Sequence, residues 1–215
     1  MKNIQALIFD YDGVIAESNA IKLSAFKELF KEEKKEDIQE LINFHVNHEG
    51  ISRIKKIEHF YNKVLKKEIS NEDLELKSTH FSRLVVKKVI ECKKVKGVRK
   101  FLKNNSDKYK CFISTGTPTE EIKMILKETK MYDFFQEIYG SPETKIQHIS
   151  SIIQKYKFNQ DNLLFVGDSN TDLLAAKKCK IKFILRSHKS NQEVDSSFSG
   201  IKFKNFYQLQ EYFDN

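Results

Sequence analysis

The sequence predicts an α/β fold, with a parallel-sheet core and an inserted all-helical domain, and two observations predict it. The first is a set of short, nearly continuous apolar runs, which suit strands buried on both faces of a parallel sheet. These runs are Ala6 to Phe9, Cys111 to Ser114, Leu163 to Val166, and Lys182 to Leu185. The second is the helical spacing of the segments between them, since alternating strands and helices imply βα units.

Two segments that separate the later runs have one apolar face each. Ile122, Ile125 and Leu126 recur at intervals of three or fewer residues, and a longer set recurs in the same way: Ile146, Ile149, Ile152, Ile153 and Tyr156. Such spacing predicts amphipathic helices that bury one stripe against the sheet.

Residues 18–94 break the alternation. Apolar residues recur there at helical spacing in four successive stretches, with no convincing strand between them. Gly97 then marks the return to the core. A chain of 215 residues fits one core domain with a smaller insert. We therefore expect a core of residues 1–17 and 95–215 and a helical domain of residues 18–94.

Composition narrows the class of protein. Hydrophobic residues at 40% and aromatic residues at 12% support a packed interior. The net charge of +8 comes from lysines interleaved with glutamates, which is typical of solvated helix faces, so we expect no nucleic-acid partner. A basic surface would still attract phosphorylated anions.

The N-terminal sequence and the cysteines indicate the cellular compartment. The first apolar run is too short for a signal peptide or a membrane span, so we expect no membrane association. Cys92, Cys111 and Cys179 are odd in number and widely spaced, which favours free thiols in a reducing cytoplasm. We expect a cytoplasmic monomer or dimer.

Asp10 and Asp12 end the first predicted strand, and Gly13 follows them. A glycine suits a chain that turns sharply beside a bound anion. Two adjacent carboxylates repel one another unless a cation lies between them, and Mg²⁺ held by carboxylates, water and substrate phosphate would remove that repulsion. The alternative is an ordinary D-x-D-G turn.

A second acidic pair, Asp168 and Asp172, follows the strand Leu163 to Val166. Helix capping by Asp168 or Ser169 would explain part of it, but capping needs only one such residue. Ligands of open parallel sheets bind at the carboxyl ends of the strands, so both acidic pairs should meet there.

Two further pieces could hold phosphate. Thr115 and Gly116 end another strand, where a hydroxyl and free N–H groups can bind phosphate oxygens. This stretch could equally be a helix N-cap at Thr117 or Thr119. Lys145 begins an amphipathic helix and could offset the charge of carboxylates and phosphate.

The four pieces FDYDGV, ISTGTP, GSPETK and FVGDSNTD, in this order, resemble the haloacid dehalogenase (HAD) superfamily of phosphotransferases. The resemblance covers residues 1–17 and 95–190. It implies a Rossmann-like core, and it likens the helical insert to that family's C1 cap, in the branch of phosphoglycolate phosphatases and β-phosphoglucomutases.

The resemblance also implies roles. Asp10 would be the nucleophile that forms an aspartyl-phosphate, and Asp12 the general acid and base. Thr115 and Gly116 would bind the phosphate, and Lys145 would steady the nucleophile. The Mg²⁺ cofactor would be held by Asp10, the backbone carbonyl of Asp12, Asp168 and Asp172, with Asp172 acting directly or through water.

Two other activities and one non-catalytic function are the alternatives to a phosphatase. The dehalogenase branch lacks the carboxylate at the position of Asp12, which argues against it. A sugar phosphomutase shares every core residue. A non-catalytic domain that binds a phosphorylated ligand would be expected to have lost an acidic or lysine position, and none is lost.

The stretch His48 to Arg53 contains Gly50 and predicts a loop between two helices of the insert that could close over the site. A plain surface turn with Ser52 as N-cap is the alternative. The resemblance implies that Glu49 and Arg53 select the substrate. A charged Glu49 would repel an acidic leaving group, so we expect small polyol, amino-alcohol or sugar phosphates as substrates. The stretch NHEGISR is also similar to that of small phosphatases associated with carbohydrate or surface-polysaccharide pathways, and this resemblance implies such a pathway.

Overall fold

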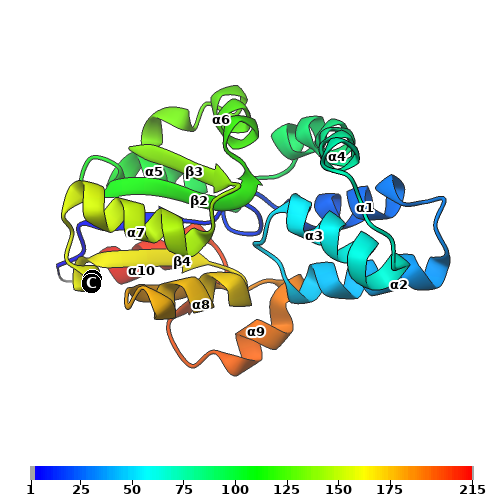
Figure 1. The fold of residues 1–215 in the computed structure, drawn as a ribbon. Coiled ribbons are helices and arrows are strands. Elements are labelled where there is room, and N and C mark those ends of the chain that lie inside the picture. Colours follow the sequence, from blue (N-terminus) through cyan, green and yellow to red (C-terminus); the bar gives the residue numbers. More distant parts are fainter. Residues whose placement is uncertain (1–2, 215) are drawn as a thin grey trace.

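A six-stranded parallel sheet forms the centre of the computed structural model, which describes residues 3–214. The strands lie in the order β3-β2-β1-β4-β5-β6 (Figure 1). Their bounds are β1 (Ala6–Phe9), β2 (Lys110–Pro118), β3 (Glu137–Ser141), β4 (Leu163–Gly167), β5 (Lys182–Arg186) and β6 (Lys202–Phe203). The predicted α/β fold class is confirmed.

Each strand of the sheet centre is buried on both faces. In β1, Ala6 and Ile8 pack on one side, while Leu7 and Phe9 pack on the other, and all four are fully buried. Burying such side chains contributes about 1.5–3 kcal/mol each for the larger ones. This is why the apolar runs could be recognised in the sequence.

Helices cover both faces of the sheet. One face packs against α5 (Val98–Asn105), α6 (Thr119–Glu128) and α10 (Phe206–Asp214), and the other against α7 (Lys145–Tyr156) and α8 (Asn170–Lys178). The short α9 (Gln192–Ser197) and the 3₁₀ turns η2 (Tyr132–Phe134), η3 (Gln160–Asn162) and η4 (Lys189–Asn191) lie in connections. The cysteines Cys92, Cys111 and Cys179 are free thiols.

The helical segment packs beside the carboxyl ends of the strands (Figure 1). It comprises α1 (Asn19–Leu29), α2 (Lys35–Asn47), α3 (Arg53–His59), the π-helical η1 (Phe60–Leu65) and α4 (Asn71–Glu91). The chain enters and leaves it side by side, because Glu17 N–H donates to Lys93 O and Val95 N–H to Ile15 O, each at 2.9 Å. We propose that residues 18–94 act as a cap domain on the core.

The sequence missed two strands. β3 is short and contains Gly140, and β6 has two residues, so neither has an apolar run of strand length. The edge positions of both strands explain the weak signal, since an edge strand buries less of its surface.

Candidate active site

The turn after β1 holds the predicted nucleophile. Asp10 N–H donates to Val166 O at 3.0 Å, which extends the pairing with β4, and Asp10 is only 3% exposed. Gly13 has φ +74°, and a Cβ there would lie 1.9 Å from Oδ2 of Asp168. A side chain would therefore both strain the backbone and displace an acidic residue of the site.

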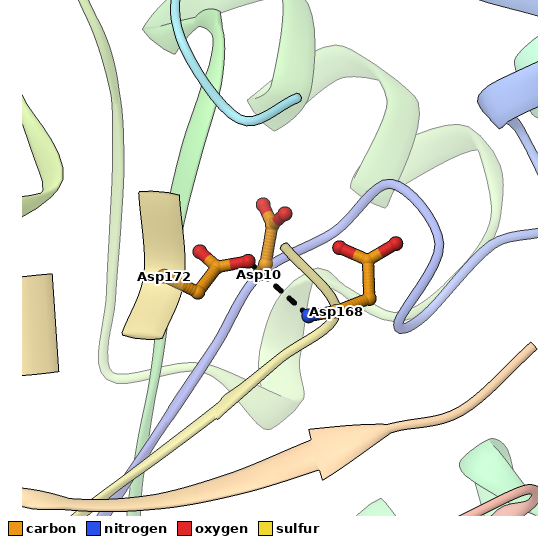
Figure 2. Close-up of side chains that lie close together, drawn as sticks. All are labelled: Asp10, Asp168 and Asp172. Carbon is orange, nitrogen blue, oxygen red and sulfur yellow. Dashed lines mark hydrogen bonds between the residues drawn. The ribbon is translucent and has the colours of Figure 1, made fainter. Parts of the chain in front are cut away.

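Three of the predicted acidic residues converge at the strand ends. Asp10 follows β1, Asp168 follows β4, and Asp172 lies in the first turn of α8 (Figure 2). All three are buried, and each offers an oxygen within 4.8 Å of the others. The order of the strands creates this meeting, because β1 and β4 are neighbours.

Both carboxylate oxygens of Asp172 accept hydrogen bonds. Its Oδ2 accepts from the N–H groups of Asp168 and Ser169 and from the Ser169 hydroxyl, and its Oδ1 accepts from Lys145 at 2.5 Å. Ser169 also caps α8, so the capping alternative and the acidic cluster are both present. An aspartate bound in this way suits a role that holds Lys145 and the turn in place.

Lys145 joins the carboxylates from the start of α7. Its Nζ lies 2.9 Å from Oδ2 of Asp10 and is buried. Burial lowers the pKa of Lys145, but Asp10 and Asp172 outweigh that effect and keep the ammonium charged. One ammonium thus faces two carboxylates.

The donor set fits a hard divalent cation. Burial raises the pKa of Asp10 well above its ordinary value, Lys145 only partly offsets this, and Asp172 and Asp168 raise the pKa further. Asn19 and His188 both donate to Oδ2 of the Asp168 carboxylate, and among residues 3–214 no hydrogen bond reaches its Oδ1, which is left for a ligand. Buried carboxylates that repel one another match what Mg²⁺ binds. The residues that would hold it are Asp10, Asp168, the Asp12 carbonyl and Asp172, the last directly or through water.

Asp12 is bound to the helical segment. Its Oδ1 accepts from Ser18 at 2.7 Å, while its Oδ2 accepts from Lys22 of α1 and from Thr117 at 3.2 Å. Burial raises the pKa of this carboxyl, but Lys22, Ser18 and Thr117 together lower it below the ordinary value. Asp12 is therefore ionised in this arrangement.

The predicted phosphate-binding residues lie at the end of β2. Thr115 is buried, and its hydroxyl accepts from Thr117 N–H at 3.2 Å. A Cβ on Gly116 would lie 2.6 Å from Gly50 O, so the loop of the helical segment rests directly on the β2 turn. Pro118, rather than Thr117 or Thr119, is the N-cap residue of α6.

A cavity of about 50 Å³, here named the interdomain cavity, lies between the strand ends and the helical segment. The core lines it with Asp10, Asp12, Thr115, Gly116, Thr117 and Asp168. The helical segment lines it with Lys22, Phe26, His45, Glu49, Arg53 and Lys56. Both predicted selector residues, Glu49 and Arg53, thus face the same cavity as the predicted nucleophile.

The charge state of Glu49 and the contacts of Arg53 differ from what the sequence suggested. Burial raises the pKa of Glu49 to about 8, with Asp168 adding to the effect, so its carboxyl is mostly neutral near pH 7. Arg53 makes a two-pronged ion pair with Glu121 of α6 and donates to Ser82 of α4. The loop itself runs between α2 and α3, and Ser52 caps α3.

Sequence reasoning missed several residues of the cavity, chiefly Lys22, His45 and Lys56. Lysine is so frequent here, with 38 Lys and Arg residues, that single lysines on helices read as solvated. His45 lies on the buried stripe of α2 with Leu41 and Ile42, which was the one available signal.

The match to a family model identifies the protein family of this chain. The family model for haloacid dehalogenase-like hydrolases matches residues 7–186, most of the chain. The chain belongs to this family. No curated protein matches this hydrolase in sequence.

Solved structures resemble the haloacid dehalogenase-like hydrolase over almost its whole length. One is described as a predicted phosphoglycolate phosphatase from Haemophilus somnus, with 17% identity, a TM-score of 0.76 and coverage of 99% of both chains. A β-phosphoglucomutase from Clostridium difficile has 18% identity and a TM-score of 0.76, covering 98% of this chain and 96% of its own. The Bacillus subtilis hydrolase YfnB, solved with magnesium, has 14% identity and a TM-score of 0.72, covering 100% of both chains. These likenesses support the fold.

The helices of this hydrolase were also compared with the length and hydropathy that a membrane span requires. Among residues 3–214, no helix is both long and apolar enough to cross a bilayer.

Proposed function

We propose that this hydrolase is a Mg²⁺-dependent phosphatase that cleaves a small phosphomonoester through an aspartyl-phosphate on Asp10. The observation that carries the proposal is the position of the Asp10 carboxylate. It lies at a strand end beside Lys145 and Asp168 and faces a cavity that Asp12 and Thr115 also line. A nucleophile, a proton carrier and phosphate ligands are thus within reach of one bound ester.

In the first step, an Oδ atom of Asp10 attacks phosphorus and the ester P–O bond breaks. Asp12 donates a proton to the departing alcohol oxygen, which is why it must be protonated when the substrate is bound. Contact with Lys22 lowers the pKa of Asp12 and keeps its carboxyl ionised in this structure. We infer that substrate binding moves Lys22 toward the phosphate, and that Asp12 then takes up its proton.

In the second step, water attacks the phosphorus of the aspartyl-phosphate, Asp12 takes the water proton, and phosphate leaves with Asp10 restored. Two smaller barriers replace one very high barrier. The Thr115 hydroxyl and the Gly116 N–H are placed to hold phosphate oxygens, and Lys145 opposes their charge. Bound Mg²⁺ would neutralise further charge on the phosphate and on Asp10.

Replacement of the nucleophile tests the proposal. Asp10→Asn keeps the size of the side chain but removes the attacking oxygen anion, so turnover of every phosphomonoester in a panel should be lost. The matched control is Asp107→Asn, an exposed aspartate in a turn, which should keep wild-type rates. Wild-type turnover by a folded Asp10→Asn variant would overturn the mechanism.

A phosphomutase is the alternative that shares these core residues. It returns the phosphoryl group to another hydroxyl of the substrate, so its turnover depends on a bisphosphate activator. Release of inorganic phosphate with no activator present supports the phosphatase.

A further inference from the structure

The segment that follows β5 is attached to Asp168 at two points. The Asn191 side-chain amide donates to the backbone carbonyl of Asp168 at 2.7 Å. Nε2 of His188 lies 2.8 Å from Oδ2 of the Asp168 carboxylate. The His188 side chain is 10% exposed and that of Asp168 is 2% exposed, so water competes little for this contact. None of the catalytic steps proposed above uses these two residues of the η4 turn.

The neighbours of the His188 ring decide which of its nitrogens donates. Nδ1 accepts from the backbone N–H of Ser190 at 3.3 Å, and a backbone N–H can only donate. The Ser190 hydroxyl lies 2.9 Å from the same nitrogen. The ring proton therefore lies on Nε2, and Nε2–H donates it to the Asp168 carboxylate.

The backbone that carries His188 is itself fixed to the core. His188 N–H donates to Oδ1 of Asn191 at 2.9 Å, and the Asn191 amide also donates to Arg186 O at 2.8 Å. Just before them, Ser187 N–H donates to Phe203 O of β6 at 2.8 Å. The side chain of His188 thus starts from a backbone held by two strands of the sheet, and a donor held in this way can fix the orientation of its acceptor.

Three separate parts of the chain enclose Oδ2 of Asp168. His188 donates to it from the core, and Asn19 of α1 donates to it from the helical segment at 3.1 Å. The turn at Gly13 approaches so closely that a Cβ there would lie 1.9 Å from this oxygen. Of the two donors, only His188 belongs to the same domain as Asp168, so the core itself supplies one hydrogen bond that orients the carboxylate.

We propose that His188 is a positioning residue for the metal site, which holds Oδ2 of Asp168 through Nε2–H and leaves Oδ1 to Mg²⁺. This inference rests on the proposed function, in which Asp168 is a metal ligand. His188 does not itself bind the metal, because its Nε2–H is directed at Asp168 and its Nδ1 accepts from Ser190. Loss of an outer hydrogen bond of this kind typically weakens metal binding about 10- to 100-fold.

Two amide variants that differ by one methylene test the inference. The amide of His188→Gln extends to about the position of Nε2 and can still donate to Asp168. The shorter amide of His188→Asn can replace only Nδ1, so it keeps the contact with Ser190 and loses the one with Asp168. In calorimetric titrations of the metal-free full chain with Mg²⁺, His188→Asn should bind about 10- to 100-fold more weakly than wild type, and His188→Gln within about 3-fold of it. His80→Asn, at an exposed histidine, is the control and should bind as wild type.

The same titrations separate failure of this inference from failure of the proposed function. Binding of Mg²⁺ by the wild type that Asp168→Asn abolishes supports the metal site, whereas a wild type that binds no Mg²⁺ overturns the metal site and the role of His188 together. Wild-type affinity in His188→Asn overturns the role of His188 alone, and so do equal losses in His188→Asn and His188→Gln, which would assign the effect to packing of the ring. A lower Tm of metal-free His188→Asn with wild-type Mg²⁺ affinity would make His188 a structural residue and also overturn the inference.

Discussion

At the scale of single residues, Asp12 is the carboxylate that serves both steps of the proposed mechanism. It is held by Ser18, Lys22 and Thr117, so its position is fixed before substrate arrives. Two of these partners belong to residues 18–94 and one to the core. The protonation state of Asp12 thus depends on how the helical segment sits on the sheet.

Asp12→Asn should separate its acid role from the rest of the site. We expect turnover of an alkyl phosphate to fall about 10²- to 10⁴-fold, because the leaving alkoxide needs a proton. An aryl phosphate such as p-nitrophenyl phosphate should lose much less in the first step, which appears as a burst of nitrophenol followed by slow hydrolysis. Equal losses for both esters, with no burst, would contradict the role.

The cluster of Asp10, Asp168 and Asp172 predicts that activity depends on a divalent metal ion. Chelation should abolish activity, Mg²⁺ should restore it, and Ca²⁺ should substitute poorly because it favours longer and more flexible coordination. Mg²⁺ should also raise the Tm of the wild type, since a ligand that binds only the folded state stabilises it. Asp168→Asn should reduce that rise. Full activity after exhaustive chelation would remove the metal from the mechanism.

At the scale of elements, the ion pair between Arg53 and Glu121 joins α3 of the helical segment to α6 of the core. Both side chains are nearly buried, and Ser82 of α4 bonds to both. The interdomain cavity beneath is far smaller than the roughly 300 Å³ of an ordinary ligand pocket. We therefore propose that this arrangement is closed and that it opens to admit an ester.

Glu121→Gln should loosen this closed arrangement. Removing one partner of a buried pair leaves the other charge unpaired, which costs about 3–5 kcal/mol. We expect a lower Tm and faster proteolysis near the connections to α1 and α4. The double variant Arg53→Met/Glu121→Leu should recover much of the Tm. The adjacent Glu120→Gln is the matched control, because that side chain is 85% exposed. A Tm for Glu121→Gln equal to that of the control would contradict the stabilising role of the ion pair between Arg53 and Glu121.

The secondary-structure elements and the motifs of the core could be predicted from the sequence better than the residues that line the interdomain cavity. β1 and β4 could be predicted because buried runs such as Leu163 to Val166 have one simple signature. Lys56 could not, because burial of a lysine depends on how α1, α2 and α3 pack, and that packing is a long-range property. Arg53 was expected at the site through the family resemblance, but its ion pair with Glu121, 68 positions away, depends on the same long-range packing.

At the scale of the whole molecule, a buried neutral histidine should make the free energy of unfolding depend on pH. His148 of α7 bridges two strands, with Nδ1 2.9 Å from the Ser114 hydroxyl and Nε2 3.1 Å from Gly140 O. Burial lowers its pKa to about 4, against an ordinary value of 6.5. It therefore links α7 to β2 and β3 in its uncharged form.

As pH falls below 6.5, the unfolded chain takes up a proton at His148 that the folded protein refuses until about pH 4. The free energy of unfolding should thus fall across this window, by up to about 1.4 kcal/mol per pH unit from this residue. Because other groups titrate as well, the measure is the difference in unfolding free energy between wild type and His148→Gln. That difference should be constant above pH 7 and shrink from pH 6.5 to 4. A constant difference throughout would contradict this account.

The position of β1 also bears on biosynthesis. β1 precedes the other strands of the sheet in the chain, yet it lies at the centre of the sheet, and its registers join Ala6 to Lys110 on one side and to Leu163 on the other. Contacts so distant in sequence form late, whereas the helices of residues 18–94 can form from local contacts. The strand that precedes the proposed nucleophile therefore stays unpaired until β2 has been made, and it gains its second neighbour only with β4, so the proposed catalytic centre is completed late.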